Sequence, residues 1–86
     1  MALETLEGIE LTRWSSSALF NRYKNHFLSG DERTESIAEE LGKRSFNERI
    51  KFYHSIKNIA CQYGPESEAR KIFSLMLDHF HRYSLD

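Results

Sequence analysis

The sequence predicts an all-α domain of four helices, with a C-terminal antiparallel helical hairpin and a short N-terminal arm. Apolar residues recur at intervals of three and four over most of the chain, the spacing that places them on one face of an α-helix. Serines and glycines stand where such stripes begin and end. With 86 residues, 40% of them hydrophobic and 29% charged, the chain has the composition of one folded domain over residues 1–86.

The hairpin is the longest predicted element and runs from Ser45 to Tyr83. Ser45 and Glu48 have the spacing of a capping box, in which the serine hydroxyl accepts a hydrogen bond from the Glu48 amide. Gly64 can take the left-handed conformation that ends a helix, and Pro65 is tolerated in the first turn of the next helix. The apolar stripes place the two helices at 46–63 and 66–83.

Two shorter helices and an arm precede the hairpin. Ser15 to Ser17 offer N-caps for a helix that runs to about Leu28. A second short helix is expected over residues 31–41, with three acidic residues near its start, where the helix dipole favours them. Residues 1–14 are expected to form a packed arm with room for one helical turn. Trp14 should anchor the arm, because so large a ring rarely stands free of a core.

Charge is unevenly distributed along the chain. The formal net charge is −1, which excludes the simplest class of nucleic-acid-binding domain, a strongly basic one. Residues 31–42 contain five acids and one arginine, whereas residues 43–64 contain five basic residues and one glutamate. Either the second segment presents a basic face to a partner, or the two segments pack side by side and neutralise each other.

Cysteine content and hydropathy bear on location. Cys61 is the only cysteine, so no disulfide can form within the chain, which fits a reducing compartment. The first residues lack the basic and apolar regions of a secretory leader, and no apolar run approaches the length of about 20 residues that crosses a bilayer. We therefore expect a cytoplasmic protein that does not contact a membrane.

The reactive side chains do not form a catalytic or metal-binding pattern. The four histidines and the cysteine show neither a His-x-x-x-His nor a Cys-x-x-Cys spacing, so we expect no metal site and no cofactor. His54 and Cys61 would lie about 10 Å apart on one helix, too far for direct proton transfer. The sequence contains no glycine-rich phosphate-binding loop. The protein is therefore predicted not to be an enzyme, and no residue is a catalytic candidate.

Residues 37–46, with the sequence Ile-Ala-Glu-Glu-Leu-Gly-Lys-Arg-Ser-Phe, resemble the first helix and turn of bacterial helix-turn-helix repressors. In that family a small residue four positions before the turn glycine lets two helices pack closely, as Ala38 and Gly42 would here. The resemblance implies DNA binding through the helix that follows. The bases and phosphates would be contacted by the turn and by the polar face of that helix, through Lys43, Arg44, Asn47, Lys51, His54 and Asn58. The alternative is that these residues form only a solvated face.

The leading hypothesis is a non-enzymatic regulatory or adaptor module that binds another protein through a helix face. It rests on a surplus of apolar residues without a reactive cluster. Self-association of the hairpin into a four-helix bundle is one form of this interaction, and it would give a homodimer. The candidate contacts are Leu3, Leu6, Leu28, Ile59 and Leu75. For each of them, the alternative is that it completes the core.

Overall fold

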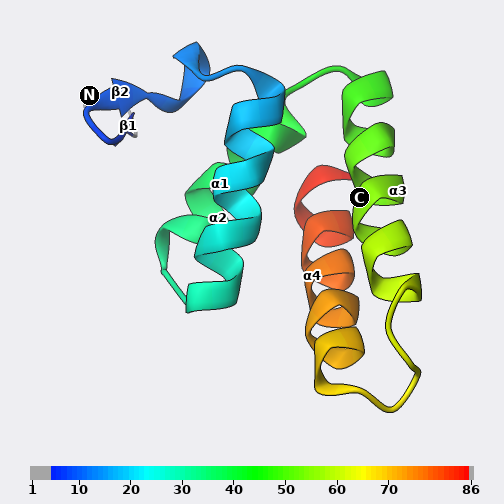
Figure 1. Ribbon diagram of the computed structural model, residues 1–86. Coiled ribbons are helices and arrows are strands. Elements are labelled where there is room, and N and C mark those ends of the chain that lie inside the picture. The colour runs from blue at the N-terminus through cyan, green and yellow to red at the C-terminus, as the bar shows by residue number, and fades with distance from the viewer. Residues whose placement is uncertain (1–4, 86) are drawn as a thin grey trace.

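The structure is a computed structural model that describes residues 5–85, and it confirms the predicted all-α fold (Figure 1). The described part contains four α-helices and one very short β-hairpin. In chain order, the elements are β1 (Thr5–Leu6), β2 (Ile9–Glu10), a 3-10 turn (Leu11–Arg13), α1 (Ser16–Ser29), α2 (Arg33–Gly42), α3 (Phe46–Cys61) and α4 (Glu68–Ser84).

The helices are arranged as two pairs (Figure 1). α3 and α4 form the predicted antiparallel hairpin, and α1 and α2 pack together beside it. α4 is the central element, because it packs on α3 along one side and on α1 and α2 along the other. The second pair covers the C-terminal part of α4, and the N-terminal part of α4 extends beyond it with α3. The molecule is accordingly elongated, with extents of 44 × 27 × 20 Å.

Serine hydroxyls cap three of the helices. Ser15 accepts a hydrogen bond from the Ala18 amide at the start of α1, with an O–N distance of 3.2 Å. Ser45 accepts one from the Glu48 amide at 3.3 Å, as its sequence spacing predicts. The cap of α4 is Ser67, which accepts from the Arg70 amide at 3.1 Å. Each of these bonds satisfies an amide that the helix itself leaves unpaired.

The joint of the hairpin differs from the prediction. Gly64 is not left-handed, and Pro65 precedes α4 instead of lying in its first turn. The amide and the hydroxyl of Ser67 both donate to the Gly64 carbonyl, at 3.0 and 2.8 Å. Residues 64–67 therefore form a turn of their own, in which proline takes the second position that favours it. The serine cap then starts α4 later than expected.

Replacing the Ser67 cap tests this reading of the joint. We expect Ser67→Ala to lower the free energy of unfolding by about 1 kcal/mol, because an amide at the start of α4 loses its acceptor. Urea denaturation followed by circular dichroism measures the change. Ser74→Ala, at an exposed position in the middle of α4, is the matched control. Equal midpoints for the two variants would show that the cap contributes nothing.

The N-terminal arm is a β-hairpin where a helical turn was considered. Glu7 and Gly8 both have positive φ, at 54° and 78°, which is the conformation of a two-residue hairpin turn. Leu6 pairs with Ile9 across the hairpin. Trp14 packs against the core as predicted, and its indole N–H donates to the Ile9 carbonyl at 3.4 Å.

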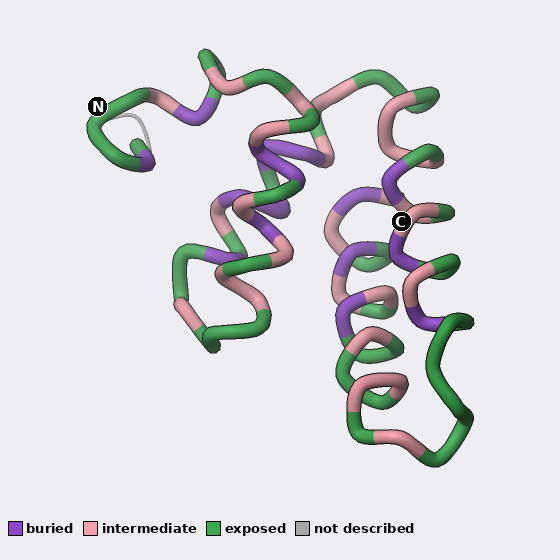
Figure 2. The backbone as a smooth tube through the Cα atoms, in the orientation of Figure 1, coloured by how far each residue is buried: buried purple, intermediate pink, exposed green. Residues whose placement is uncertain are grey.

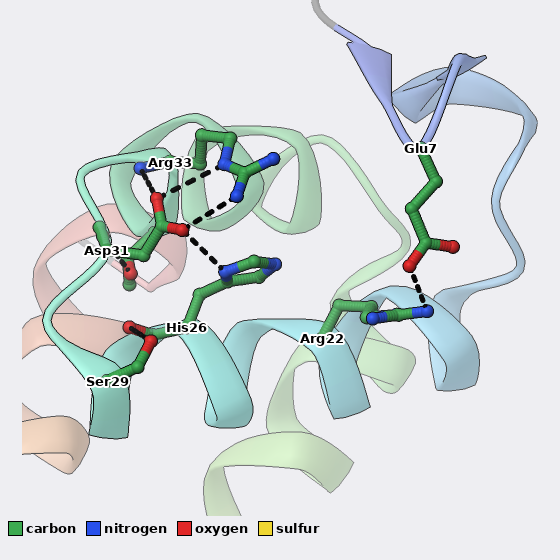
Figure 3. A network of polar contacts seen from close by, with 7 residues as sticks. Glu7, Arg22, His26, Ser29, Asp31 and Arg33 are labelled. Carbon is green, nitrogen blue, oxygen red and sulfur yellow. Dashed lines mark hydrogen bonds and ion pairs between the residues drawn. The ribbon is translucent and has the colours of Figure 1, made fainter.

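Arg22 of α1 ties this arm to the helices. Its guanidinium forms an ion pair with Glu7 (Figure 3) and also lies over the Trp14 ring, 5.6 Å from the ring centroid.

The core is built from aromatic rings between α1, α3 and α4. Phe20 stacks on Phe52 with ring centroids 4.4 Å apart. Phe80 meets Phe20 and Tyr23 edge-on, at 6.0 and 5.7 Å. Figure 2 shows that the buried positions of α4 lie along its C-terminal part. Aliphatic side chains from all four helices complete this cluster: Leu19, Ile37, Leu41, Ile56 and Met76.

The small residues of α2 receive the end of α4. A Cβ atom placed on Gly42 would lie 2.6 Å from the Tyr83 carbonyl oxygen. The Ser84 hydroxyl donates to the Ala38 carbonyl at 3.4 Å. In the helix-turn-helix resemblance, Ala38 and Gly42 would allow the helix that follows the turn to pack closely on α2. Here α2 packs chiefly on α1 and α4.

Across residues 5–85, every helix is too short or too polar to span a lipid bilayer.

Candidate protein-docking face and adjacent pocket

The five residues predicted to contact a protein differ in their exposure to solvent. Leu75 and Leu28 are exposed, at 63% and 51% of their surface, as a docking role requires. Ile59 is half-buried. Leu6 is wrong as a surface contact, because it is 1% exposed and belongs to the core cluster. Leu6 therefore completes the core, which was the alternative for each of these residues. Leu3 lies outside the described residues.

An apolar surface remains on the part of α4 that α1 leaves uncovered. Ile72 is 40% exposed and, with Leu75 and the half-buried His79, lies on one stripe of α4, since residues three and four apart share a helix face. Leu28 lies at the end of α1, beside Phe27, whose ring is 5.5 Å from that of His79. We call Leu28, Ile72 and Leu75 the docking face.

Helical spacing places Ile72 on the same side of α4 as the buried Met76, and the sequence gives only one hint of its exposure. α1 has 14 residues and α4 has 17, so the shorter helix cannot cover the longer one along its whole length. In the structure, the side-chain contacts of α1 with α4 extend from Phe80 to Met76 and His79. Ile72 lies one turn beyond Met76.

A shallow pocket adjoins the docking face. It has a volume of about 270 Å³ and lies between the end of α1, the start of α2 and His79 of α4. Its lining residues are Phe27, Gly30, Asp31, Glu32, Thr34, Glu35 and His79. Two aromatic rings are among these residues, and three carboxylates come from the α1–α2 turn and the first turn of α2. Phe27 and His79 of the pocket are the chain neighbour of Leu28 and the residue one turn beyond Leu75.

Asp31 holds the α1–α2 turn together (Figure 3). Its carboxylate accepts from the Arg33 amide at 2.8 Å and from the Arg33 guanidinium at 3.2 and 2.8 Å. The same carboxylate lies 3.1 Å from Nδ1 of His26. The hydrogen bonds from Arg33 hold the pKa of Asp31 well below its usual range. The negative charge of Asp31 is therefore balanced within the protein.

His79 is the most enclosed titratable group beside the pocket. Its Nδ1 lies 2.9 Å from the Tyr23 hydroxyl, which also donates to the Met76 carbonyl at 3.3 Å. The Tyr83 ring is 4.7 Å from the imidazole. Burial lowers the pKa of His79, Glu35 opposes this shift, and Arg82 reinforces it. Burial also raises the pKa of Tyr23, which therefore stays protonated.

The lowered pKa of His79 predicts that the stability of the fold depends on pH. A histidine whose pKa is lower in the folded state stabilises the fold fully above its unfolded pKa of about 6.5, and this stabilisation is lost as the pH falls. We expect the free energy of unfolding to decrease from pH 7.5 to 5.5, and His79→Phe to flatten this slope. Urea titrations at several pH values measure it. An unchanged slope in His79→Phe, matching that of the control His54→Phe, would contradict this assignment.

The predicted DNA contacts fall into two groups. Five of them are exposed on the turn and the outer face of α3: Lys43, Asn47, Lys51, His54 and Asn58. Arg44 is different, since its side chain is only 18% exposed. Its guanidinium donates to the Leu11 carbonyl at 3.0 Å and lies 3.8 Å from the Glu40 carboxylate. Arg44 therefore joins the start of α3 to the arm. Its basic character alone does not distinguish this structural role from a contact with phosphate.

Arg49 has a similar structural role. Its guanidinium donates to the carbonyls of Arg44 and Ser84, at 3.0 and 2.5 Å, and so connects the start of α3 to the end of α4. Two of the five basic residues in the segment 43–64 thus serve the fold.

The metal-ligating side chains do not gather into a further candidate site in the described part of the chain. Within residues 5–85, no three His, Cys, Asp or Glu side chains lie close enough together to hold a metal ion. Cys61 is an exposed free thiol at the end of α3. No family model, curated protein or solved structure matches the chain.

Proposed function

We propose that this protein is a non-enzymatic adaptor or regulatory module that binds another protein through the docking face. The observation that carries the proposal is the exposure of Leu75, at 63%, and of Ile72, at 40%, on α4, together with that of Leu28, at 51%, at the end of α1. Burying three such side chains in an interface would contribute several kcal/mol, at about 25 cal/mol per Å² of apolar surface removed from water. An α-helix of a partner laid on α4 would continue the layer that α1 and α2 begin.

Affinity capture from the native extract tests this proposal. We expect the wild-type protein to retain a discrete partner that the Leu75→Ser variant loses, because the variant puts a hydroxyl at the centre of the apolar contact. Ser74→Ala, one residue away on α4, is the control and should retain the partner. Circular dichroism should show both variants folded, since both positions are exposed.

The same capture would contradict the proposal in two ways. The first is that the wild type retains no partner that the Leu75→Ser variant lacks. The second is that Ser74→Ala loses the partner to the same extent as Leu75→Ser.

A second candidate function is DNA binding through α3. One observation favours it: Asn47, Lys51, His54 and Asn58 are all exposed on one side of a helix at the edge of the molecule. We expect duplex binding that weakens as salt rises and is lost in the double variant Asn47→Ala with Lys51→Ala. No retardation of any duplex at about 50 mM salt, where non-specific affinity is strongest, would dismiss it.

Location and self-association follow the leading proposal. A cytoplasmic site of action suits an exposed, unpaired thiol such as that of Cys61, because a reducing compartment protects it. A homodimer is the form of the proposal in which the partner is a second copy of the chain. Sedimentation equilibrium of wild type and Leu75→Ser distinguishes it: only the wild type would then have the mass of a dimer.

A further inference from the structure

We infer that the occupant of the docking face is an amphipathic helix of the partner, with a cationic side chain that enters the pocket between Phe27 and His79. This inference rests on the proposed function and specifies the chemistry of the partner. It follows from the charge around the pocket, from the rings that line it and from the length of α4 that extends beyond α1.

The charge of the pocket is complementary to a cation. Among its lining residues are three carboxylates and neither lysine nor arginine. Asp31 is balanced by Arg33, as its short contacts show. Glu32 and Glu35 are exposed, and within residues 5–85 neither forms an ion pair. Asp31 also accepts from the Arg33 amide at the start of α2, so neither Glu32 nor Glu35 is needed to satisfy that amide.

The rings that line the pocket suit the same ligand. The rings of Phe27 and His79 stand at 62° to each other, with centroids 5.5 Å apart. Ring faces attract cations, and the attraction increases where water is excluded. His79 remains neutral at physiological pH because burial lowers its pKa, so it adds no repulsive charge. The methylene stem of a lysine or arginine would also find apolar contact against both rings.

The geometry of α4 favours a helix as the carrier of that cation. The part of α4 that packs on α3 but extends beyond α1, residues 68–75, has a length of about 12 Å, or two helical turns. Two turns of a partner helix present apolar residues at positions i and i+3 or i+4, which match the spacing of Ile72 and Leu75. The stripe continues to His79 at the border of the pocket. A basic residue one turn beyond the apolar pair would therefore reach the carboxylates.

Two synthetic helical peptides of about 18 residues serve as probes. They share one leucine stripe, and their flanking positions carry lysine in one peptide and glutamate in the other. Fluorescence anisotropy at physiological salt measures their binding to the full chain. We expect the lysine peptide to bind at least about tenfold more tightly. Glu35→Gln should weaken the lysine peptide about fivefold without weakening the glutamate peptide. Leu75→Ser should weaken both peptides.

Glu66→Gln is the matched control, since Glu66 is exposed in the α3–α4 turn and does not line the pocket. Equal affinity of the two peptides, failure of both to bind, or equal effects of Glu35→Gln and Glu66→Gln would overturn the inference. Equal affinity that still depends on Leu75 would leave the docking face intact. A charge preference that ignores Leu75→Ser would instead contradict the docking face. Dimerisation that blocks both peptides would identify a second copy as the occupant and overturn the inference.

Discussion

Replacing Phe80 with alanine is expected to lower the free energy of unfolding by about 4 kcal/mol. Phe80 is fully buried, and its ring contacts those of Phe20 and Tyr23 at the junction of α1 with α4. The variant loses the transfer energy of the ring and gains a cavity that its rigid aromatic neighbours cannot fill. A domain of this size has a stability of order 5 kcal/mol, so about 1 kcal/mol would remain and roughly 15% of the variant should be unfolded at 25 °C.

Urea denaturation monitored by circular dichroism and by Trp14 fluorescence measures this loss. Phe46→Ala is the control of the same chemistry, because Phe46 is 58% exposed at the start of α3. Its effect should remain within about 0.5 kcal/mol. A Phe80→Ala variant as stable as Phe46→Ala would show that the rings between α1, α3 and α4 are not the core.

Gly42→Ala is expected to destabilise the protein by about 2 kcal/mol, although alanine is the better helix former. Gly42 is helical with negative φ, so the backbone itself would accept a side chain. The added Cβ would lie 2.6 Å from the Tyr83 carbonyl oxygen. Because that atom belongs to the backbone of α4, α2 and α4 must move apart, and Ser84 must leave Ala38.

Gly64→Ala is the control for Gly42→Ala, because it makes the same substitution at a position without a close neighbour. Gly64 also has negative φ, and a Cβ there would meet nothing within 4 Å. Alanine should therefore be neutral or stabilise by up to about 1 kcal/mol, through reduced freedom of the unfolded chain. Thermal unfolding of both variants provides the comparison. If Gly42→Ala were as stable as Gly64→Ala, the close approach of α2 and α4 would be absent in solution.

The fold was predictable from the sequence because its signals are local. Apolar spacing identified all four helices, and the Ser45 cap placed the start of α3 at Phe46, as observed. Where two local signals competed, the prediction failed. Gly64 and Pro65 fit a helix end followed by a helix start, but they equally fit a turn capped by Ser67, and the structure has the turn.

The site was only partly predictable, because exposure depends on contacts between distant segments. Leu75 falls outside the stripe of α4 that apolar spacing assigns to the core, so its exposure follows from helical spacing alone. Ile72 falls within that stripe and is exposed only because α1 ends too early to cover it. In the sequence Arg44 looks like a free cation, but in the folded chain its guanidinium donates a hydrogen bond to the Leu11 carbonyl of the arm. The pocket joins residues about 50 positions apart, which periodicity along the chain does not address.

The central claim is that a closed aromatic core leaves one apolar face of α4 open to a partner. Methyl NMR of the free protein with a soluble paramagnetic gadolinium chelate tests it most directly, because the chelate broadens only those methyl groups that water reaches. The account predicts strong broadening for Leu28, Ile72 and Leu75, and none for Ile37 and Ile56 of the core. Protection of Ile72 and Leu75 to the level of Ile56 would contradict it, since the face would then already be covered.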